Sequence, residues 1–131
     1  PSKELQVEVL KKIKNHLKSE GIFINQPAYI GNVNDRDILS QAYNSNDKIG
    51  KRFFQSSDIN DIYKASGFST PTKIGDGKEM IITEQDHTQR YGLNADDIKN
   101  IQNILKEAKN NAEVTPTGYS LKFEFPIFLS K

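Results

Sequence analysis

The chain has 131 residues, of which 35% are hydrophobic and 27% are charged, and this length suits one domain with one core. The absence of cysteine excludes disulfides, zinc–thiolate sites and thiol nucleophiles. A formal net charge of +1 is too small to predict nucleic-acid binding from bulk charge. Any nucleic-acid site would therefore be a local patch.

The sequence shows no targeting segment. No apolar run approaches the roughly 20 residues that a membrane-spanning helix needs, so we expect no membrane anchor. No basic and then apolar stretch opens the chain as in a signal peptide. Because the chain starts at Pro1 and not at a methionine, we expect a fragment of a longer protein, in which any export signal would lie elsewhere.

Residues 3–19 are expected to form an amphipathic helix, which Ser2 can cap and Gly21 can stop. Short apolar stretches broken by glycine, asparagine and proline follow at 21–25 and 27–31 and favour short strands. The stripe of the helix that should face the core consists of Gln6, Val9, Leu10, Ile13 and Leu17.

Two more helices complete a helical N-terminal part, which extends to about residue 67. One lies near 35–44, where Asn34 and Asp37 have the spacing of a capping pair. The other occupies 57–67 and ends at a glycine, and 69–78 is expected to be a loop. The core-facing residues of the two helices are Ile38, Leu39, Ala42, Tyr43, Ile59, Ile62 and Tyr63.

A sheet-and-helix part is expected over about 78–131. It begins with a strand at 78–83 that runs directly into a short helix. Thr83 and Asp86 have capping-box spacing, and Gly92 stands at the position that stops the helix.

A second amphipathic helix follows, capped by Asn94, with Ile98, Ile101, Leu105 and Ala108 on its apolar stripe. After a turn at 116–118, the strict alternation over 119–125 predicts a half-buried antiparallel strand. Pro126 should end the ladder or mark an edge. The expected fold class is therefore α+β, with N-terminal helices packed on a small antiparallel sheet in a single domain over 1–131.

Sequence motifs of the large enzyme classes are absent. The chain contains no GxxxxGK(S/T), GxGxxG, HExxH or GxSxG motif and no EF-hand loop. Two histidines far apart, with no cysteine, provide no metal-ligand spacing. We expect no metal site and no cofactor.

The most informative segment is Ile81–Leu93. Here Glu84, His87 and either Arg90 or Tyr91 recur at helical i, i+3, i+4 spacing and share one face. RNA cleavage needs a base for the ribose 2′-hydroxyl, an acid for the leaving 5′-oxygen and a positive group for the phosphate. Histidine titrates near neutral pH and arginine can hold two phosphate oxygens, so this face could supply all three.

The alternative for the same face is a polar surface helix. Glu84 and Arg90 would then be solvated and His87 would cap or pack, which is the commoner arrangement of mixed charges. Spacing does not decide between the two. On the catalytic interpretation His87 is partly exposed, and its replacement by alanine would stop cleavage without unfolding the chain.

The order of features in this segment resembles the core of the barnase/EndoU/colicin/RelE-type nuclease toxins. The shared features are a strand ending in Ile-Thr-Glu, a histidine and a basic residue on a short turn, then Gly-Leu and a capped Asp-Asp-Ile helix. The likeness covers roughly 78–125. Because only about twenty residues follow the second helix, the sheet must borrow earlier strands or be smaller.

The resemblance implies metal-independent RNA cleavage, often of tRNA. It also implies the C-terminal toxin of a contact-dependent inhibition or phage-associated protein, delivered into a target bacterium, with a cognate immunity protein as partner. His87 would be the general base or acid, Arg90 a phosphate ligand, and Tyr91 stands where such toxins often have a second basic residue. Candidate supporting groups in the last hairpin are Thr115, Thr117, Tyr119 and Lys122.

Two further features have commoner structural explanations. His16 could pair with His87 as an acid/base couple, but a histidine flanking a helix stripe is more often packed or solvated. A basic-aromatic cluster resembles a patch for single-stranded RNA, although a turn followed by core phenylalanines is commoner. The cluster consists of Lys48, Lys51, Arg52, Phe53 and Phe54.

Two functions remain open from the sequence. One is a toxin ribonuclease that acts through His87 and Arg90. The other is a non-catalytic protein-binding module, such as an immunity or phage accessory protein, that docks through its helical N-terminal half. A protein that neutralises a nuclease tends to be acidic, so the sequence pI of about 8.4 favours the first.

Overall fold

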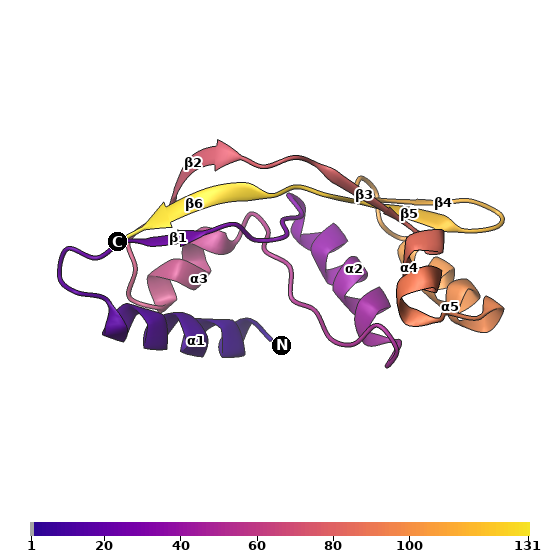
Figure 1. Ribbon diagram of the computed structural model, residues 1–131, viewed down its shortest axis with the longest axis horizontal. Coiled ribbons are helices and arrows are strands. Elements are labelled where there is room, and N and C mark those ends of the chain that lie inside the picture. Colours follow the sequence, from indigo (N-terminus) through magenta and orange to yellow (C-terminus); the bar gives the residue numbers. More distant parts are fainter. Residues whose placement is uncertain (1) are drawn as a thin grey trace.

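The computed structural model describes residues 2–131 and shows an α+β fold, as the sequence predicts. All five helices lie on one side of a long, curved set of strands (Figure 1). None of the helices in this described part is both long and apolar enough to cross a membrane. The helices are α1 (Lys3–His16), α2 (Val33–Asn44), α3 (Ile59–Ala65), α4 (Glu84–Tyr91) and α5 (Ala95–Leu105). The strands are β1 (Phe23–Asn25), β2 (Thr72–Asp76), β3 (Met80–Thr83), β4 (Ala112–Val114), β5 (Tyr119–Phe123) and β6 (Pro126–Ser130).

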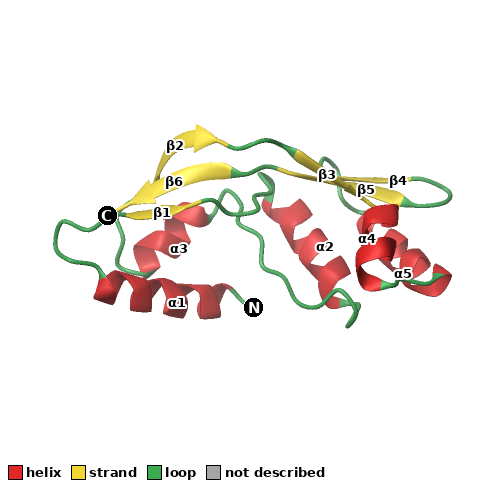
Figure 2. Cartoon of the chain, in the orientation of Figure 1, coloured by secondary structure: helices red, strands yellow, loops and turns green. Residues whose placement is uncertain are grey.

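The strands form two three-stranded antiparallel sheets, with orders β1-β6-β2 and β3-β5-β4. Figure 2 shows the two sheets end to end, because β2 leads into β3 and β5 leads into β6. At the junction the Gly77 amide donates to the Phe125 carbonyl at 2.7 Å, so 72–83 and 119–130 form one nearly continuous ribbon. Three strands that precede α5, namely β1, β2 and β3, therefore complete the two sheets. Such borrowing of earlier strands is one of the two possibilities expected from the sequence, because few residues follow α5.

Side-chain caps fix the starts of four helices. Ser2 caps α1, and capping boxes that begin at Thr83 and Asn94 start α4 and α5, all as predicted. The cap of α2 was predicted wrongly: Asn32 and not Asn34 accepts the amide hydrogen bond. Both asparagines suit the role, and the helix begins two residues earlier than its apolar spacing indicates.

The first helix differs from its prediction at its end and on one face. It ends at His16 and not at residue 19. Val9 is 48% exposed, whereas Val7 packs against buried residues. The helix touches the rest of the molecule mainly through α3, so only a narrow strip of it is covered and Leu10 alone is fully buried.

Two segments near the ribbon junction also differ from prediction. Residues 69–78 contain β2 and are not a loop; this edge strand is mostly exposed, so it lacks the apolar alternation that marks a half-buried strand. Pro126 begins β6, the central strand of its sheet, and does not end the ladder. A proline is tolerated at the first residue of a strand, where its missing N–H removes little pairing.

The core is divided into two clusters along the ribbon. One lies between α2, α5 and the β3-β5-β4 sheet, and consists of Ile30, Leu39, Ala42, Tyr43, Ile49, Phe54, Leu93, Ile101, Leu105, Tyr119, Leu121 and Phe123. The other lies between α1, α3 and the β1-β6-β2 sheet, and consists of Leu10, Ile59, Ile62, Tyr63, Phe68 and Phe128.

A buried carboxylate ties α2 to the segment before β4. The Asp35 side chain is 1% exposed and accepts hydrogen bonds from the backbone amides of Lys109, Asn110 and Asn111, at 2.9, 2.7 and 2.9 Å. Burial by itself raises the pKa of Asp35, but the three amide donors outweigh burial and hold the pKa below its usual value. The contact fixes α2 relative to the β4–β5 hairpin, and α2 forms one wall of the site described next.

Candidate functional site

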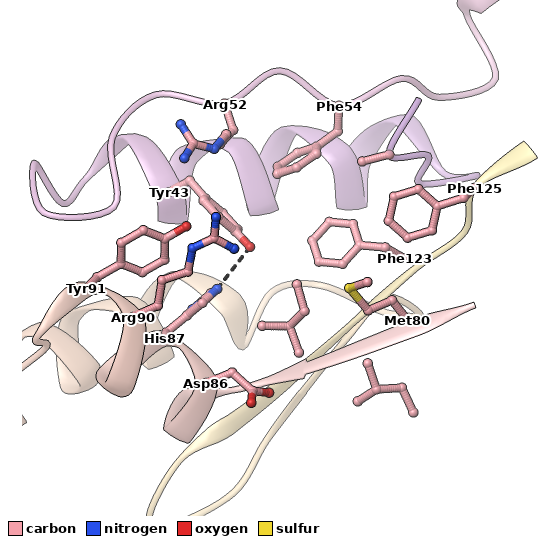
Figure 3. Close-up of a pocket in the computed structure, with 13 residues that line it drawn as sticks. Tyr43, Arg52, Phe54, Met80, Asp86, His87, Arg90, Tyr91, Phe123 and Phe125 are labelled. Carbon is pink, nitrogen blue, oxygen red and sulfur yellow. Dashed lines mark hydrogen bonds between the residues drawn. The ribbon is translucent and has the colours of Figure 1, made fainter. Parts of the chain in front are cut away.

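A pocket of about 450 Å³ lies between α2 with the segment after it, and β3 with α4 (Figure 3). Several of its lining side chains are exposed, so the pocket opens to solvent. Its lining residues are Ala28, Tyr43, Arg52, Phe54, Met80, Ile81, Ile82, Asp86, His87, Arg90, Tyr91, Phe123 and Phe125.

The local sequence places His87 at this pocket. The capping box of Thr83 and Asp86 starts α4 as soon as β3 ends, and Gly92, in the left-handed region with φ 67°, stops the helix after two turns. The short helix stands against the ribbon, and its inner face carries His87. This side chain is 4% exposed.

Two tyrosines hold the imidazole ring. Nε2 of His87 lies 3.1 Å from the Tyr43 hydroxyl, and Nδ1 lies 2.7 Å from the Tyr119 hydroxyl. A neutral imidazole donates through one nitrogen and accepts at the other, so one tyrosine donates to the ring and the other accepts from it. The three side chains form a hydrogen-bonded chain from the pocket, at Tyr43, to the core, at Tyr119.

Burial controls the protonation of this chain. It lowers the pKa of His87; the neighbouring Asp86 carboxylate opposes the shift and Arg90 adds to it. Burial raises the pKa of Tyr43 and of Tyr119 well above that of a free phenol. At neutral pH both tyrosines are therefore protonated, and His87 is a neutral base able to accept a proton.

Two arginines from opposite walls line the pocket near Tyr43. Arg90 comes from α4 and Arg52 from the segment after α2. Both line the pocket beside Tyr43, and their positive charges oppose the rise in the pKa of Tyr43 that burial causes. Within residues 2–131 neither arginine forms an ion pair with a carboxylate, and the Asp86 carboxylate accepts from the Thr83 amide at 2.8 Å. This end of the pocket can bind an anion.

The other end of the pocket is apolar. Figure 3 shows Phe54, Phe123, Phe125 and Met80 grouped on one side of the Tyr43–His87 hydrogen bond, with Arg52, Arg90 and Tyr91 around its other side. Phe54 and Phe123 are buried, whereas Met80 is 48% exposed at the mouth. The pocket thus joins a cationic end to an aromatic end.

Only part of the predicted site meets at this pocket. His87, Arg90 and Tyr91 line it, and Tyr119 reaches it through His87. Glu84 does not line it, because its side chain packs against Gly118 in the last hairpin. The predicted supporting groups Thr115, Thr117 and Lys122 are exposed on that hairpin and do not line the pocket either.

The exposure of His87 was predicted wrongly. The catalytic interpretation made it a partly exposed residue, whereas the side chain is buried and both ring nitrogens bond to tyrosines, Tyr43 of α2 and Tyr119 of β5. His16 is exposed on α1, with Nδ1 2.7 Å from the Lys12 carbonyl, and is not part of this site.

Sequence reasoning did not assign Tyr43, Phe54 or Arg52 to a site with His87. Tyr43 and Phe54 were interpreted as core residues, which they also are. The basic-aromatic cluster around Arg52 was the sequence signal for this part of the site, but only some of its residues reach the pocket. Arg52 and Phe54 line it. Phe53 packs under Arg36, and Lys48 pairs with Asp97 of α5. Over residues 2–131 no three acidic or histidine side chains gather as metal ligands.

Comparisons identify a fold and no family. No protein-family model matches the chain, and no curated protein matches its sequence. The crystal structure of the YcgJ protein from Bacillus subtilis is similar to it, with a TM-score of 0.71 and 15% sequence identity. The match covers 95% of this chain and 56% of that one, so this chain spans little more than half the length of YcgJ. Similarity at this identity shows a shared fold and does not transfer a function.

Proposed function

We propose that this chain is a metal-independent ribonuclease that cleaves RNA at the His87 pocket. One observation carries the proposal: a buried histidine is hydrogen-bonded to a tyrosine at a pocket that is also lined by two arginines, neither of which pairs with a carboxylate among residues 2–131. Of the three requirements of RNA cleavage, the pocket offers a proton acceptor and a positive group for the phosphate, and the acid for the leaving 5′-oxygen is left to solvent.

The proton path runs through Tyr43. The ribose 2′-hydroxyl lies against the Tyr43 hydroxyl and gives it a proton, while Tyr43 passes its own proton to Nε2 of His87. In this path the His87 Nδ1–H donates to the Tyr119 hydroxyl and Nε2 is the acceptor, one of the two tautomers that the contacts of both nitrogens allow. Arg52 and Arg90 hold the phosphate oxygens as charge grows on them. The 2′-oxygen bonds to phosphorus, the bond to the 5′-oxygen breaks, and the leaving oxygen takes a proton from solvent, leaving a 2′,3′-cyclic phosphate.

A toxin setting extends this proposal. The resemblance of 78–125 to nuclease toxins favours tRNA as substrate, and on this proposal the chain would be the last domain of a longer bacterial protein delivered into a competing cell. A cognate immunity protein would then cover the pocket. Its matching surface would be acidic, because Arg52 and Arg90 stand at the cationic end of the pocket.

A non-catalytic protein-binding module is the second candidate. The observation that favours it is the partly uncovered first helix, on which Leu5 and Val9 are 47% and 48% exposed. Docking through this helix would need no role for the pocket, so variants at His87 would leave binding of a partner unchanged.

The deciding experiment incubates the purified chain with total bacterial RNA, with and without a metal chelator. Discrete products ending in a 2′,3′-cyclic phosphate, equal in both tubes and absent with His87→Gln, are expected. Gln89→Ala, a change at an exposed residue of the same helix, is the matched control and should cleave normally. Intact RNA in every tube would reject the ribonuclease and leave the binding module.

A further inference from the structure

The shape and lining of the pocket limit the RNA that it can accept. Its volume of about 450 Å³ falls in the range of small-ligand sites, roughly 300–1,000 Å³, and exceeds what a bare phosphate needs. The space beyond the arginines is lined by Phe54, Phe123, Phe125 and Met80. A group attached to the phosphate and able to lie against aromatic rings would fill it.

A base in a duplex cannot reach such a space. It is stacked and paired, and must leave the helix before it can enter a pocket of this kind. Unpaired RNA presents its bases without that cost. The lining of the apolar end offers aromatic and aliphatic surface and no side-chain amide or hydroxyl to read a base edge. Stacking on such surface tolerates any base.

We infer that the pocket is a two-part site for one unpaired nucleotide, in which Arg52 and Arg90 hold the phosphate and the Phe54, Phe123, Phe125 and Met80 surface takes the base. The inference rests on the proposed function for the identity of the ligand as RNA. It adds a role for Arg52, a requirement for single-stranded substrate and a weak preference among bases.

The role of Arg52 follows from its position. It stands on the wall opposite α4, so Arg90 and Arg52 approach a phosphate from two sides. Its NH1 donates to the Lys51 carbonyl at 3.1 Å, which restrains the side chain and leaves its other N–H groups for an anion. Lys51 is exposed and does not line the pocket, so it is a matched neighbour of the same charge.

Binding is tested by calorimetry with three probes: adenosine 3′-monophosphate, ribose 5-phosphate and inorganic phosphate. The nucleotide is expected to bind about 5- to 150-fold more tightly than ribose 5-phosphate, which corresponds to base stacking of about 1–3 kcal/mol. Arg52→Gln is expected to weaken nucleotide binding at least about fivefold, and Met80→Ala to reduce the advantage of the nucleotide over ribose 5-phosphate. Lys51→Gln should do neither.

Equal affinity for the nucleotide and ribose 5-phosphate would overturn the base site. Unchanged nucleotide binding in Arg52→Gln would overturn the role of Arg52 in holding the phosphate. No binding of any probe would overturn both the phosphate site and the base site. A 12-nucleotide RNA should be cut at least about tenfold faster alone than annealed to its complement, and equal rates would contradict the requirement for unpaired RNA. Nucleotide binding without any RNA cleavage would reject the ribonuclease and keep the nucleotide site, whereas cleavage without preference for the nucleotide would reject this inference alone.

Discussion

The Tyr119 hydroxyl lies 2.7 Å from Nδ1 of His87, on the side of the imidazole away from the pocket. Tyr119 begins β5, is 4% exposed and belongs to the larger core cluster, so it cannot turn away from the ring. It therefore holds His87 in one orientation from inside the protein, while Tyr43 contacts the same ring from the pocket. This makes Tyr119 a positioning residue that does not touch substrate.

Replacement of Tyr119 by phenylalanine should separate positioning from stability. The ring remains in the core, but Nδ1 of the buried His87 loses its partner, so the free energy of unfolding should fall by about 1–3 kcal/mol. Without its Nδ1 partner, His87 no longer favours the tautomer with Nε2 open, so kcat for RNA cleavage should fall at least about tenfold and its pH profile should move. Urea unfolding and rates measured between pH 5 and 8 test this.

Tyr63→Phe is the control for that change. Tyr63 is also fully buried, and its hydroxyl accepts a hydrogen bond from Nδ2 of Asn25 at 2.7 Å, but it lies in the other core cluster. It should lose similar stability and cleave RNA with the parent pH profile. An unshifted pH profile in Tyr119→Phe, or the same shift in both variants, would reduce Tyr119 to a structural residue.

His87→Ala should be both inactive and unstable, in contrast to the behaviour expected of an exposed histidine. It leaves the Tyr119 hydroxyl without its partner in the core, and an unpaired buried group costs about 1–3 kcal/mol. His87→Gln retains a polar side chain and should unfold at a urea concentration nearer that of the parent. Its rate should nevertheless fall about a hundred- to ten-thousandfold. A folded glutamine variant that cleaves at the parent rate would contradict the assignment.

The extent to which the site could be predicted depends on how far apart its parts lie in the sequence. The cap at Thr83, the stop at Gly92 and the helix between them are local signals, so α4 and the shared face of His87 and Arg90 were predictable. The hydrogen bonds of His87 join residues separated by 44 and 32 positions, and no local pattern encodes such contacts. Arg52 was recognisable as part of a basic cluster. Its place in the pocket could not be predicted, because that wall of the pocket forms only when α2 and the segment after it pack opposite α4.

The contrast between local and long-range signals also explains why β2 was not predicted. The spacing over 119–125 predicts a half-buried strand, and Tyr119, Leu121 and Phe123 are buried as expected. In β2, by contrast, the residues are mostly exposed and the strand is held by backbone pairing with β6. Backbone pairing leaves little trace in side-chain sequence, so an edge strand of this kind looks like a loop.

Gly77→Ala should destabilise the junction between the two sheets. A Cβ at this position would lie 2.8 Å from the Phe125 carbonyl oxygen, which accepts the hydrogen bond of the Gly77 amide. Relief requires the backbone to shift, so the free energy of unfolding should fall by about 1–3 kcal/mol. Gly31→Ala is the control, because its Cβ would meet only the Tyr29 ring at 3.9 Å. Equal unfolding midpoints in urea for the two variants would contradict the close approach at Gly77.

Asp35→Asn should weaken the connection between α2 and the β4–β5 hairpin and change the response to acid. The carboxylate accepts three backbone amides, whereas an amide side chain has one oxygen and turns N–H donors toward the same amides. We expect a loss of about 2–4 kcal/mol at pH 7, since the bonds are charge-assisted and buried. The pKa of Asp35 is lowered in the folded state, so the unfolded chain takes up the proton first as pH falls. The contribution of the carboxylate is therefore complete above the unfolded pKa, about 4, and is lost as pH falls through the folded pKa.

The difference in stability between the parent and Asp35→Asn, measured by urea unfolding from pH 7 to pH 2, should accordingly narrow below about pH 4. The exposed Asp47→Asn should track the parent throughout. A constant difference between Asp35→Asn and the parent down to pH 2 would show that the pKa of Asp35 is the same in the folded and unfolded states, which would contradict the lowered pKa.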